Sequence, residues 1–197
     1  KKIGAVNTIV NKNGKLFGTN TDWLGAIQAL EEKIRLRGKT VAVLGAGGAS
    51  RAVVYGLKQK GAVIHIFNRT LENAKKLEEE FKLEGAHLPD DQNLISEMDI
   101  IINTTSVGMT PNTDASPIPM ECIKSHQIVF DIIFAPKDTK LLQYAQAKKA
   151  QIVYGYKMLL YQAIPQFELF TGEKAPIKVM ERSLINNLRL QGRLLRG

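Results

Sequence analysis

The stretch from 40 to 61 constrains this chain more than any other, because an apolar run leads directly into a glycine-rich turn and a helix-forming segment. It reads TVAVLGAGGASRAVVYGLKQKG. In such a turn the first glycine permits a tight bend, the second lets the backbone approach a pyrophosphate, and a small third residue lets helix and strand pack closely. Gly45, Gly47 and Ser50 occupy these places. The context therefore favours a dinucleotide-binding turn over a chance glycine-rich loop.

Strand-like and helix-like segments alternate through the middle of the chain. The strand-like runs are continuously apolar, as in parallel strands that helices cover on both faces. We therefore predict an α/β fold, a doubly wound Rossmann-like parallel sheet over 38–155. The expected strands are 40–45, 62–68, 98–104, 127–134 and 151–155, and the expected helices are 49–61, 70–82 and 139–150.

The two ends of the chain fall outside this alternation. Segments 3–10 and 15–20 predict a β-hairpin, since Asn13-Gly14 between them is typical of a type I′ turn. Apolar spacing predicts a helix from Trp23 to Arg35, capped by Thr21 or Asp22 and ended by Gly38. Two amphipathic helices are expected over 156–172 and 177–188, packing with the hairpin. No structure is predicted for the basic stretch 189–197.

These segments suggest four parts. Residues 1–22 are expected to be the remnant of a truncated second domain, and 23–37 a connecting helix. Residues 38–155 form the expected Rossmann-like domain, and 156–197 the closing helices. The first residues, KKIGAVNTIV, enter an apolar run without an initiator Met, so we expect a fragment whose upstream part is missing.

The end of the second strand bears on the choice of cofactor. NAD-binding proteins of this class generally place an acidic residue there, whereas an arginine accommodates the 2′-phosphate of NADP. Asn68, Arg69 and Thr70 follow the strand, which favours NADP. Alternatively, Thr70 caps the next helix, Arg69 is solvated and Glu72 is the acid of an NAD site. The loop 103–109, NTTSVGM, is expected at the same sheet edge, bordering the nicotinamide half of the cofactor.

Composition argues against several other kinds of protein. The net charge of +8 is spread along the chain rather than gathered with aromatics, so no nucleic-acid partner is expected. His65, His87 and His126 are too far apart to predict a metal site. The single Cys122 allows no internal disulfide, and neither a signal peptide nor a membrane-spanning run is evident, so we expect a cytoplasmic protein without a membrane partner.

Six motifs in order carry a resemblance to a known family. They are GAVNT, NTD, GAGGASRA, NRT, NTTSVGM and GYKMLLYQA, between Gly4 and about Leu188. At these separations the chain resembles the shikimate dehydrogenases. The resemblance implies an oxidoreductase that reversibly reduces 3-dehydroshikimate to shikimate with NADPH, in the biosynthesis of chorismate and the aromatic amino acids. A monomer or homodimer is expected.

The resemblance implies that 1–22 is the end of an α/β catalytic domain that binds substrate. It also implies that 38–155 is the NADP-binding domain and that 156–197 are closing helices that pack toward the catalytic domain.

The resemblance also assigns roles to residues. Asn7, Asp22 and Gln162 would contact substrate, with Asp22 the catalytic carboxylate partner of a lysine. Without the resemblance, the sequence favours an ordinary structural role for each of them: an edge-strand residue, a helix cap and a polar position on an apolar helix face. The cofactor would be bound by Gly45, Ala46, Gly47, Gly48 and Ala49 at the pyrophosphate, by Asn68, Arg69 and Thr70 at the adenosine ribose and 2′-phosphate, and by Thr104, Ser106, Val107, Gly155 and Met158 near the nicotinamide.

The chain also departs from the family's pattern. The family's acid/base lysine and carboxylate-binding serines are expected upstream, and Lys1 and Lys2 are not substitutes, so the stretch alone is expected to bind NADP but to catalyse poorly. Phe134 stands where tyrosine is frequent. Lys157 replaces a common glycine, and either adds positive charge near an acidic substrate or points to water. The alternatives are a quinate/shikimate dehydrogenase that uses NAD and a non-catalytic NADP-binding module.

Overall fold

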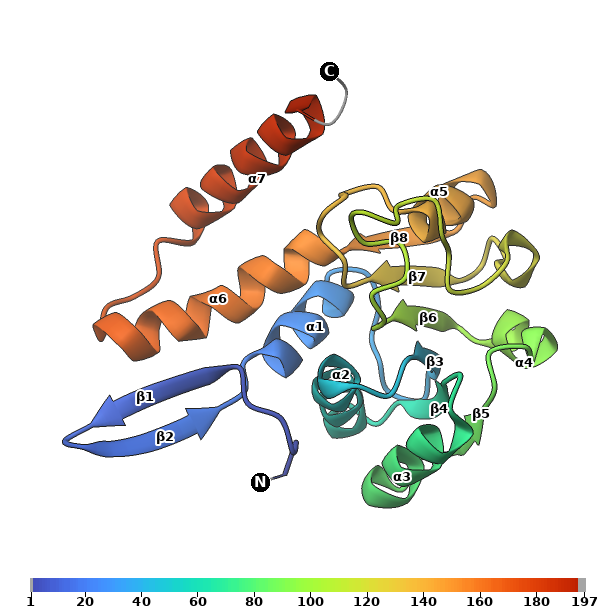
Figure 1. The fold of residues 1–197 in the computed structure, drawn as a ribbon, viewed down its shortest axis with the longest axis horizontal. Coiled ribbons are helices and arrows are strands. Elements are labelled where there is room, and N and C mark those ends of the chain that lie inside the picture. Colours follow the sequence, from blue (N-terminus) through green and yellow to red (C-terminus); the bar gives the residue numbers. More distant parts are fainter. Residues whose placement is uncertain (1, 195–197) are drawn as a thin grey trace.

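A six-stranded parallel sheet forms the body of the protein, and a two-stranded antiparallel hairpin stands beside it (Figure 1). The computed structural model describes residues 2–194, and side-chain surroundings as far as Leu188. The strands are β1 Thr8–Lys12, β2 Lys15–Thr19, β3 Thr40–Leu44, β4 Val63–Phe67, β5 Gly85–His87, β6 Ile100–Asn103, β7 Ile128–Asp131 and β8 Gln151–Tyr154. The helices are α1 Asp22–Glu31, α2 Gly48–Gln59, α3 Leu71–Phe81, α4 Gln92–Glu97, the 3-10 turn η1 Met120–Cys122, α5 Lys140–Ala147, α6 Gly155–Thr171 and α7 Ile177–Leu194.

The strand order is β5-β4-β3-β6-β7-β8, which is the doubly wound arrangement that the sequence predicts. In the parallel register Val43 of β3 lies between Ile66 of β4 and Ile102 of β6. The chain reverses its direction of winding between β3 and β6, and in such sheets ligands bind beyond the carboxyl ends of the strands at that point. The order of the strands therefore places a binding crevice next to the glycine-rich turn.

Both faces of the sheet are buried, since successive strand residues contribute to different cores. Val41 and Val43 belong to the core formed with α1, α2, α3 and α6. Ala42 and Leu44 belong to the core formed with α4, η1 and α5 on the other face. Burial on both sides explains why the strands read as continuous apolar runs rather than alternating ones.

Several elements differ from the sequence-based expectation. β5 and α4 were not expected, because β5 is only Gly85–His87 and α4 is a short helix started by Asp91, whose side chain accepts a hydrogen bond from the Leu94 N–H at 3.3 Å. The helix expected to reach Arg35 ends at Glu31, where a turn follows. The apolar spacing continued past this point because Ile34 packs against the core without being helical. α7 runs to Leu194, beyond the expected end at 188.

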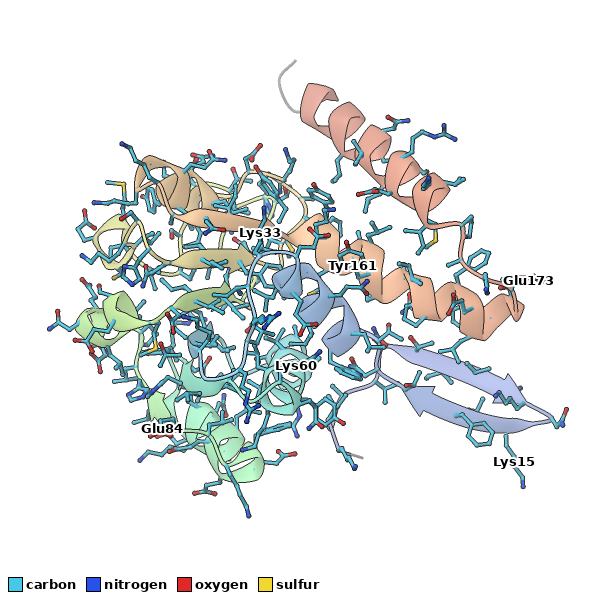
Figure 2. All side chains as sticks on the ribbon, turned by 180° about the vertical axis from the view of Figure 1, so that it is seen from behind. Lys15, Lys33, Lys60, Glu84, Tyr161 and Glu173 are labelled. Carbon is cyan, nitrogen blue, oxygen red and sulfur yellow. The ribbon has the colours of Figure 1, made fainter. Side chains whose placement is uncertain are left out.

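The hairpin has the predicted turn, with positive φ at Asn13 (52°) and Gly14 (81°). Its first strand starts only at Thr8, because Gly4 adopts a φ of 70° that interrupts an extended run. The hairpin projects away from the sheet, with Lys15 near its far end (Figure 2). Gln166 of α6 donates a 2.9 Å hydrogen bond to the Thr8 hydroxyl, so α6 packs with the hairpin as expected.

The long helix α6 starts at the carboxyl end of β8 and crosses α1 on its way to the hairpin (Figure 1). The two helices approach closely at Gly25, where an added Cβ would lie 2.5 Å from the Met158 carbonyl oxygen. α7 packs along α6. In the part of the chain that the structure describes, no helix has the length and apolarity needed to cross a membrane.

Candidate functional site

The glycine-rich turn joins β3 to α2 at the carboxyl edge of the sheet. Gly45 has a φ of 106°, and an added Cβ there would lie 2.9 Å from the Thr104 hydroxyl oxygen, so this position requires glycine. At Gly47 and Gly48 an added Cβ would meet no atom within 4 Å. The backbone at the N-terminus of α2 therefore borders open space, as a cradle for a phosphate group requires.

Ser50 lies at the third place of the motif and is fully buried. Its hydroxyl donates a 2.7 Å hydrogen bond to the carbonyl oxygen of Gly47. A small side chain whose polar atom is satisfied within the first turn lets α2 pack closely on the sheet.

A cleft of about 420 Å³ opens beside this turn. It lies where β3, β4 and β6 end, as the strand order requires. Its lining includes eight of the residues expected to bind cofactor, namely Gly45, Ala46, Gly47, Asn68, Arg69, Thr104, Ser106 and Val107. Thr105, which belongs to the loop 103–109 expected at this edge, also lines the cleft. Four lining residues were not expected, namely Leu44, Phe67, Pro89 and Pro117. Gly48, Ala49, Thr70, Gly155 and Met158 do not line this cleft.

One end of the cleft is formed by the residues after β4. The Asn68 side chain donates a 2.9 Å hydrogen bond to the Thr70 carbonyl oxygen, which fixes the turn. Thr70 is the N-cap residue of α3 but its side chain makes no capping hydrogen bond. Arg69 is exposed, and among the described residues none forms an ion pair with it. Its guanidinium is thus available to an anionic ligand at the cleft.

The other end is formed by the loop after β6. The Thr104 hydroxyl donates a 2.6 Å hydrogen bond to the Leu44 carbonyl oxygen, and the Thr104 N–H donates to the same oxygen at 2.9 Å. These bonds hold the loop against the glycine-rich turn. Thr105 was expected only as part of the loop 103–109, because a single hydroxyl in a polar loop gives no signal of its own.

A second polar cluster forms where the start of α1 meets α6 and the segment before β1. The Asn7 amide group donates hydrogen bonds to Asp22 Oδ1 at 2.8 Å and to Gln162 Oε1 at 3.3 Å. The Thr21 hydroxyl also donates to Gln162 Oε1, at 3.2 Å, and the Thr21 N–H donates to Asn7 Oδ1, at 2.9 Å. Three residues expected to contact substrate are therefore neighbours, and Thr21 is a member that sequence reasoning named only as a helix cap.

Burial raises the pKa of the Asp22 carboxyl, and the hydrogen bond from Asn7 offsets part of that rise. A partly desolvated carboxylate that accepts a hydrogen bond from an amide group is suited to orient a hydroxyl or an ammonium group. Thr21, rather than Asp22, is the residue preceding α1, and Asp22 is the first residue of the helix.

Gly155 and Met158 lie deeper in the fold, whereas Phe134 lies at the surface. Gly155 starts α6 so close to the backbone after β7 that an added Cβ would collide with the carbonyl oxygens of Ile132 and Ile133. Met158 is buried in the core beneath α6. Phe134 is exposed.

The Lys157 side chain is ion-paired rather than solvated. Its ammonium group forms ion pairs with Glu32 at 3.3 Å and with Glu181 of α7 at 3.2 Å. Two carboxylates supplied by neighbouring segments hold the charge, so the side chain does not simply extend into water.

The parallel sheet and the glycine-rich cleft define a dinucleotide-binding α/β protein. The family model described as shikimate / quinate 5-dehydrogenase matches residues 28–151, and the shikimate 5′-dehydrogenase C-terminal domain matches residues 155–185. The chain belongs to the shikimate/quinate dehydrogenase family.

Individual relatives agree with this assignment. The shikimate dehydrogenase (NADP(+)) of Aquifex aeolicus is 44% identical over 185 residues, which cover 93% of this chain and 67% of the relative. That of Methanosarcina acetivorans is 42% identical over 197 residues, 95% of this chain and 70% of the relative. The structure of shikimate 5-dehydrogenase from Thermus thermophilus in complex with NADP(H) and shikimate superposes with a TM-score of 0.85 at 36% identity, covering 94% of this chain and 69% of that one.

Proposed function

We propose that this protein is an NADP-dependent shikimate dehydrogenase, which reversibly reduces 3-dehydroshikimate to shikimate on the route to chorismate and the aromatic amino acids. The observation that carries the proposal is the cleft at the switch point of the sheet, where the glycine-rich turn and Arg69 lie together. Relatives over 40% identical are named shikimate dehydrogenase (NADP(+)), which supports this reaction.

The residues at the turn fit the pyrophosphate of NADP. Gly47 and Gly48 leave open the space that a Cβ would fill, and the positive end of the α2 dipole faces it. We assign Gly45, Ala46, Gly47, Gly48 and Ala49 to this group. Gly48 and Ala49 act through their backbone N–H groups in the first turn of α2.

The residues after β4 fit the adenosine 2′-phosphate. Arg69 places an exposed guanidinium group at the cleft. Among the residues that the structure describes, no carboxylate lines the cleft, so none would repel a phosphate there. Asn68 and Thr70 shape the turn that presents it. Glu72, the acid that would favour NAD, lies in the first turn of α3 and does not line the cleft.

The nicotinamide half is assigned to the loop after β6 and to the start of α6. Thr104, Ser106 and Val107 line the cleft. Gly155 allows α6 to start at the carboxyl edge of the sheet, and Met158 supports that helix from the core. NADPH supplies the hydride that this reaction needs.

The cluster of Asn7, Asp22 and Gln162 is assigned to the substrate. Hydride addition to a ring carbonyl leaves an oxyanion, which needs a nearby proton donor. Asp22 would orient that donor, a lysine expected upstream in the family. The amides of Asn7 and Gln162 would bind substrate hydroxyl groups, and the hydrogen bonds among the three residues fix their positions beforehand.

The same arrangement supports a proposal for organisation and location. The hairpin packs with α6 apart from the sheet, so we assign 1–22 and 156–197 to the substrate domain, 23–37 to a connection and 38–155 to the cofactor domain. Cys122 is a buried free thiol, in keeping with a reducing cytoplasm. A monomer or homodimer remains the expected assembly.

Fluorescence titration with NADPH and NADH tests the cofactor assignment. Arg69→Ala is expected to raise the Kd for NADPH by about 10- to 100-fold, since hydrogen bonds to charged groups are lost, and to change the Kd for NADH less than about twofold. Arg37→Ala is the control, because Arg37 is also exposed but precedes β3 at the opposite sheet edge. Equal losses for both cofactors would exclude the 2′-phosphate role of Arg69.

Rates with shikimate and with quinate, each in the presence of NADP and of NAD, test the reaction. Shikimate with NADP is expected to be the preferred pair. A preference for quinate with NAD would favour the alternative dehydrogenase. Binding of NADPH with no turnover in protein that includes the upstream lysine would favour a non-catalytic module.

A further inference from the structure

A buried carboxylate next to the cofactor cleft has no role in the function proposed above. Asp131 ends β7, one strand beyond β6, and is fully buried. Its Oδ1 accepts hydrogen bonds from the Asn103 amide at 3.0 Å and from the Ile133 N–H at 3.1 Å. Its Oδ2 accepts one from the Thr139 hydroxyl at 2.7 Å. It does not line the cleft, so any effect on the cleft must pass through one of these partners.

Asn103 connects this carboxylate to the wall of the cleft. Its Nδ2 donates to Asp131 and also to the Val107 carbonyl oxygen at 3.3 Å. Its Oδ1 accepts from the Thr105 N–H at 3.0 Å and from the Thr105 hydroxyl at 2.7 Å. The Thr105 hydroxyl oxygen accepts in turn from the Val107 N–H at 3.1 Å. One buried amide thus holds both Thr105 and Val107, which line the cleft.

The orientation of the Asn103 amide depends on what lies behind it. An amide has a donor end and an acceptor end, whereas an ionised carboxylate can only accept. The oxygen of Asp131 that faces Asn103 also receives the Ile133 N–H, so it must act as an acceptor. Asn103 must therefore turn its NH₂ group toward Asp131 and its oxygen toward Thr105.

We propose that Asp131 is a positioning residue for the cofactor, which fixes the Asn103 amide and through it the loop Thr104–Val107 that walls the cleft. This inference rests on the proposed binding of NADP. Without the Asp131 carboxylate, the side-chain amide of Asn103 can rotate by half a turn. The loop then loses the two hydrogen bonds that Asn103 Oδ1 accepts from Thr105. The cofactor would have to order this loop on binding, which weakens affinity.

Three variants separate positioning from general stability. Asp131→Ala removes every acceptor. Asp131→Asn keeps the oxygen that faces Asn103 and Ile133, and its NH₂ group donates to the Thr139 hydroxyl. Thr139→Val removes the bond on the α5 side and leaves the Asn103 side intact. Each protein is titrated with NADPH by fluorescence, and hydrogen exchange of the Thr105 and Val107 amides is measured without cofactor.

Asp131→Ala is expected to raise the Kd for NADPH by about five- to tenfold and to speed amide exchange in the loop, since roughly two loop bonds are lost. In Asp131→Asn, the Kd for NADPH and the rate of amide exchange in the loop are both expected to stay within about twofold of the parent. Thr139→Val is expected to lower the melting temperature with the Kd nearly unchanged. If Asp131→Ala does not fold, Thr105→Val removes the hydroxyl bonds of the loop at a less buried position and is expected to give the same two effects.

Two results would overturn the inference. One is unchanged loop exchange and NADPH affinity in a folded Asp131→Ala or Thr105→Val protein. The other is an equal loss of affinity in Thr139→Val and Asp131→Ala, which would indicate general loosening of the sheet. Failure of the parent protein to bind NADPH would instead count against the proposed function.

Discussion

The amide of Asn7 donates a 2.8 Å hydrogen bond to the carboxylate of Asp22, and so joins the segment before β1 to the first turn of α1. The same amide reaches Gln162, which is 155 residues away in the chain. Burial raises the pKa of Asp22 and Asn7 partly opposes that rise. A preassembled polar cluster of this kind can bind a polyhydroxylated substrate without first ordering its side chains.

Asp22→Asn is expected to lower turnover of shikimate by about 10²-fold or more, because the charge that orients the proton donor is lost. The Kd for NADPH should stay within about twofold of the parent, since Asp22 does not line the cofactor cleft. The measurement is kcat and KM in protein that includes the upstream lysine, together with a fluorescence titration. A parallel loss of NADPH affinity would mean that the variant disturbs the fold rather than the chemistry.

Two glycines of the turn are expected to respond differently to alanine. Gly45→Ala forces a side chain into a φ of 106° and against Thr104, so it should lower the free energy of unfolding by about 1–3 kcal/mol as well as weaken NADPH. Gly47→Ala meets no protein atom within 4 Å, so it should leave stability nearly unchanged and weaken only NADPH. Urea denaturation and NADPH titration measure the two effects. If Gly47→Ala kept full affinity for NADPH, the assignment of the pyrophosphate to this turn would be wrong.

Gly25→Ala tests the contact between α1 and α6. The added Cβ would lie 2.5 Å from the Met158 carbonyl oxygen and 2.9 Å from the Gln162 Cβ, so the helices must separate. We expect a loss of about 1–3 kcal/mol in the free energy of unfolding and weaker shikimate binding, because Gln162 moves away from Asn7. Calorimetric titration with shikimate and urea denaturation check this. Unchanged shikimate binding would argue against a substrate role for Gln162.

The cofactor cleft was predictable from sequence because its residues follow local rules. A glycine-rich turn between strand and helix has a fixed relation to the sheet edge, and the ends of β4 and β6 meet it through the strand order alone. Arg69 and Thr104 could thus be placed together although they are far apart in the chain. β5 was missed because Gly85–His87 pairs with β4 through backbone groups and carries no apolar run.

The polar cluster of Asn7, Asp22 and Gln162 was predictable only through the family resemblance. Asn7, Asp22 and Gln162 lie on three separate elements, and each has an ordinary structural explanation by itself. What joins them is the close crossing of α1 and α6, which depends on tertiary packing. The pairing of Lys157 with Glu32 and Glu181 escaped prediction for the same reason, since no local pattern places α7 beside α6.

The last prediction concerns pH and Asp131. Burial raises the pKa of its carboxyl from 3.8 to about 6, and the hydrogen bonds from Thr139, Ile133 and Asn103 only partly oppose the rise. The folded protein therefore binds a proton more tightly here than the unfolded chain does. Ionisation of Asp131 above about pH 6 costs stability, and that cost is relieved as the pH falls toward 4.

Asp131→Asn cannot ionise and so lacks this dependence. The free energy of unfolding of the parent, minus that of Asp131→Asn, is expected to rise by about 2 kcal/mol between roughly pH 7.5 and 4.5. Urea denaturation of both proteins across this range measures the difference, in which the other titrating groups cancel. Asp114→Asn, at an exposed loop position, controls for the loss of one formal charge. A difference that stays flat, or that falls as the pH is lowered, would contradict a raised pKa because it would mean that the folded protein favours the ionised carboxylate.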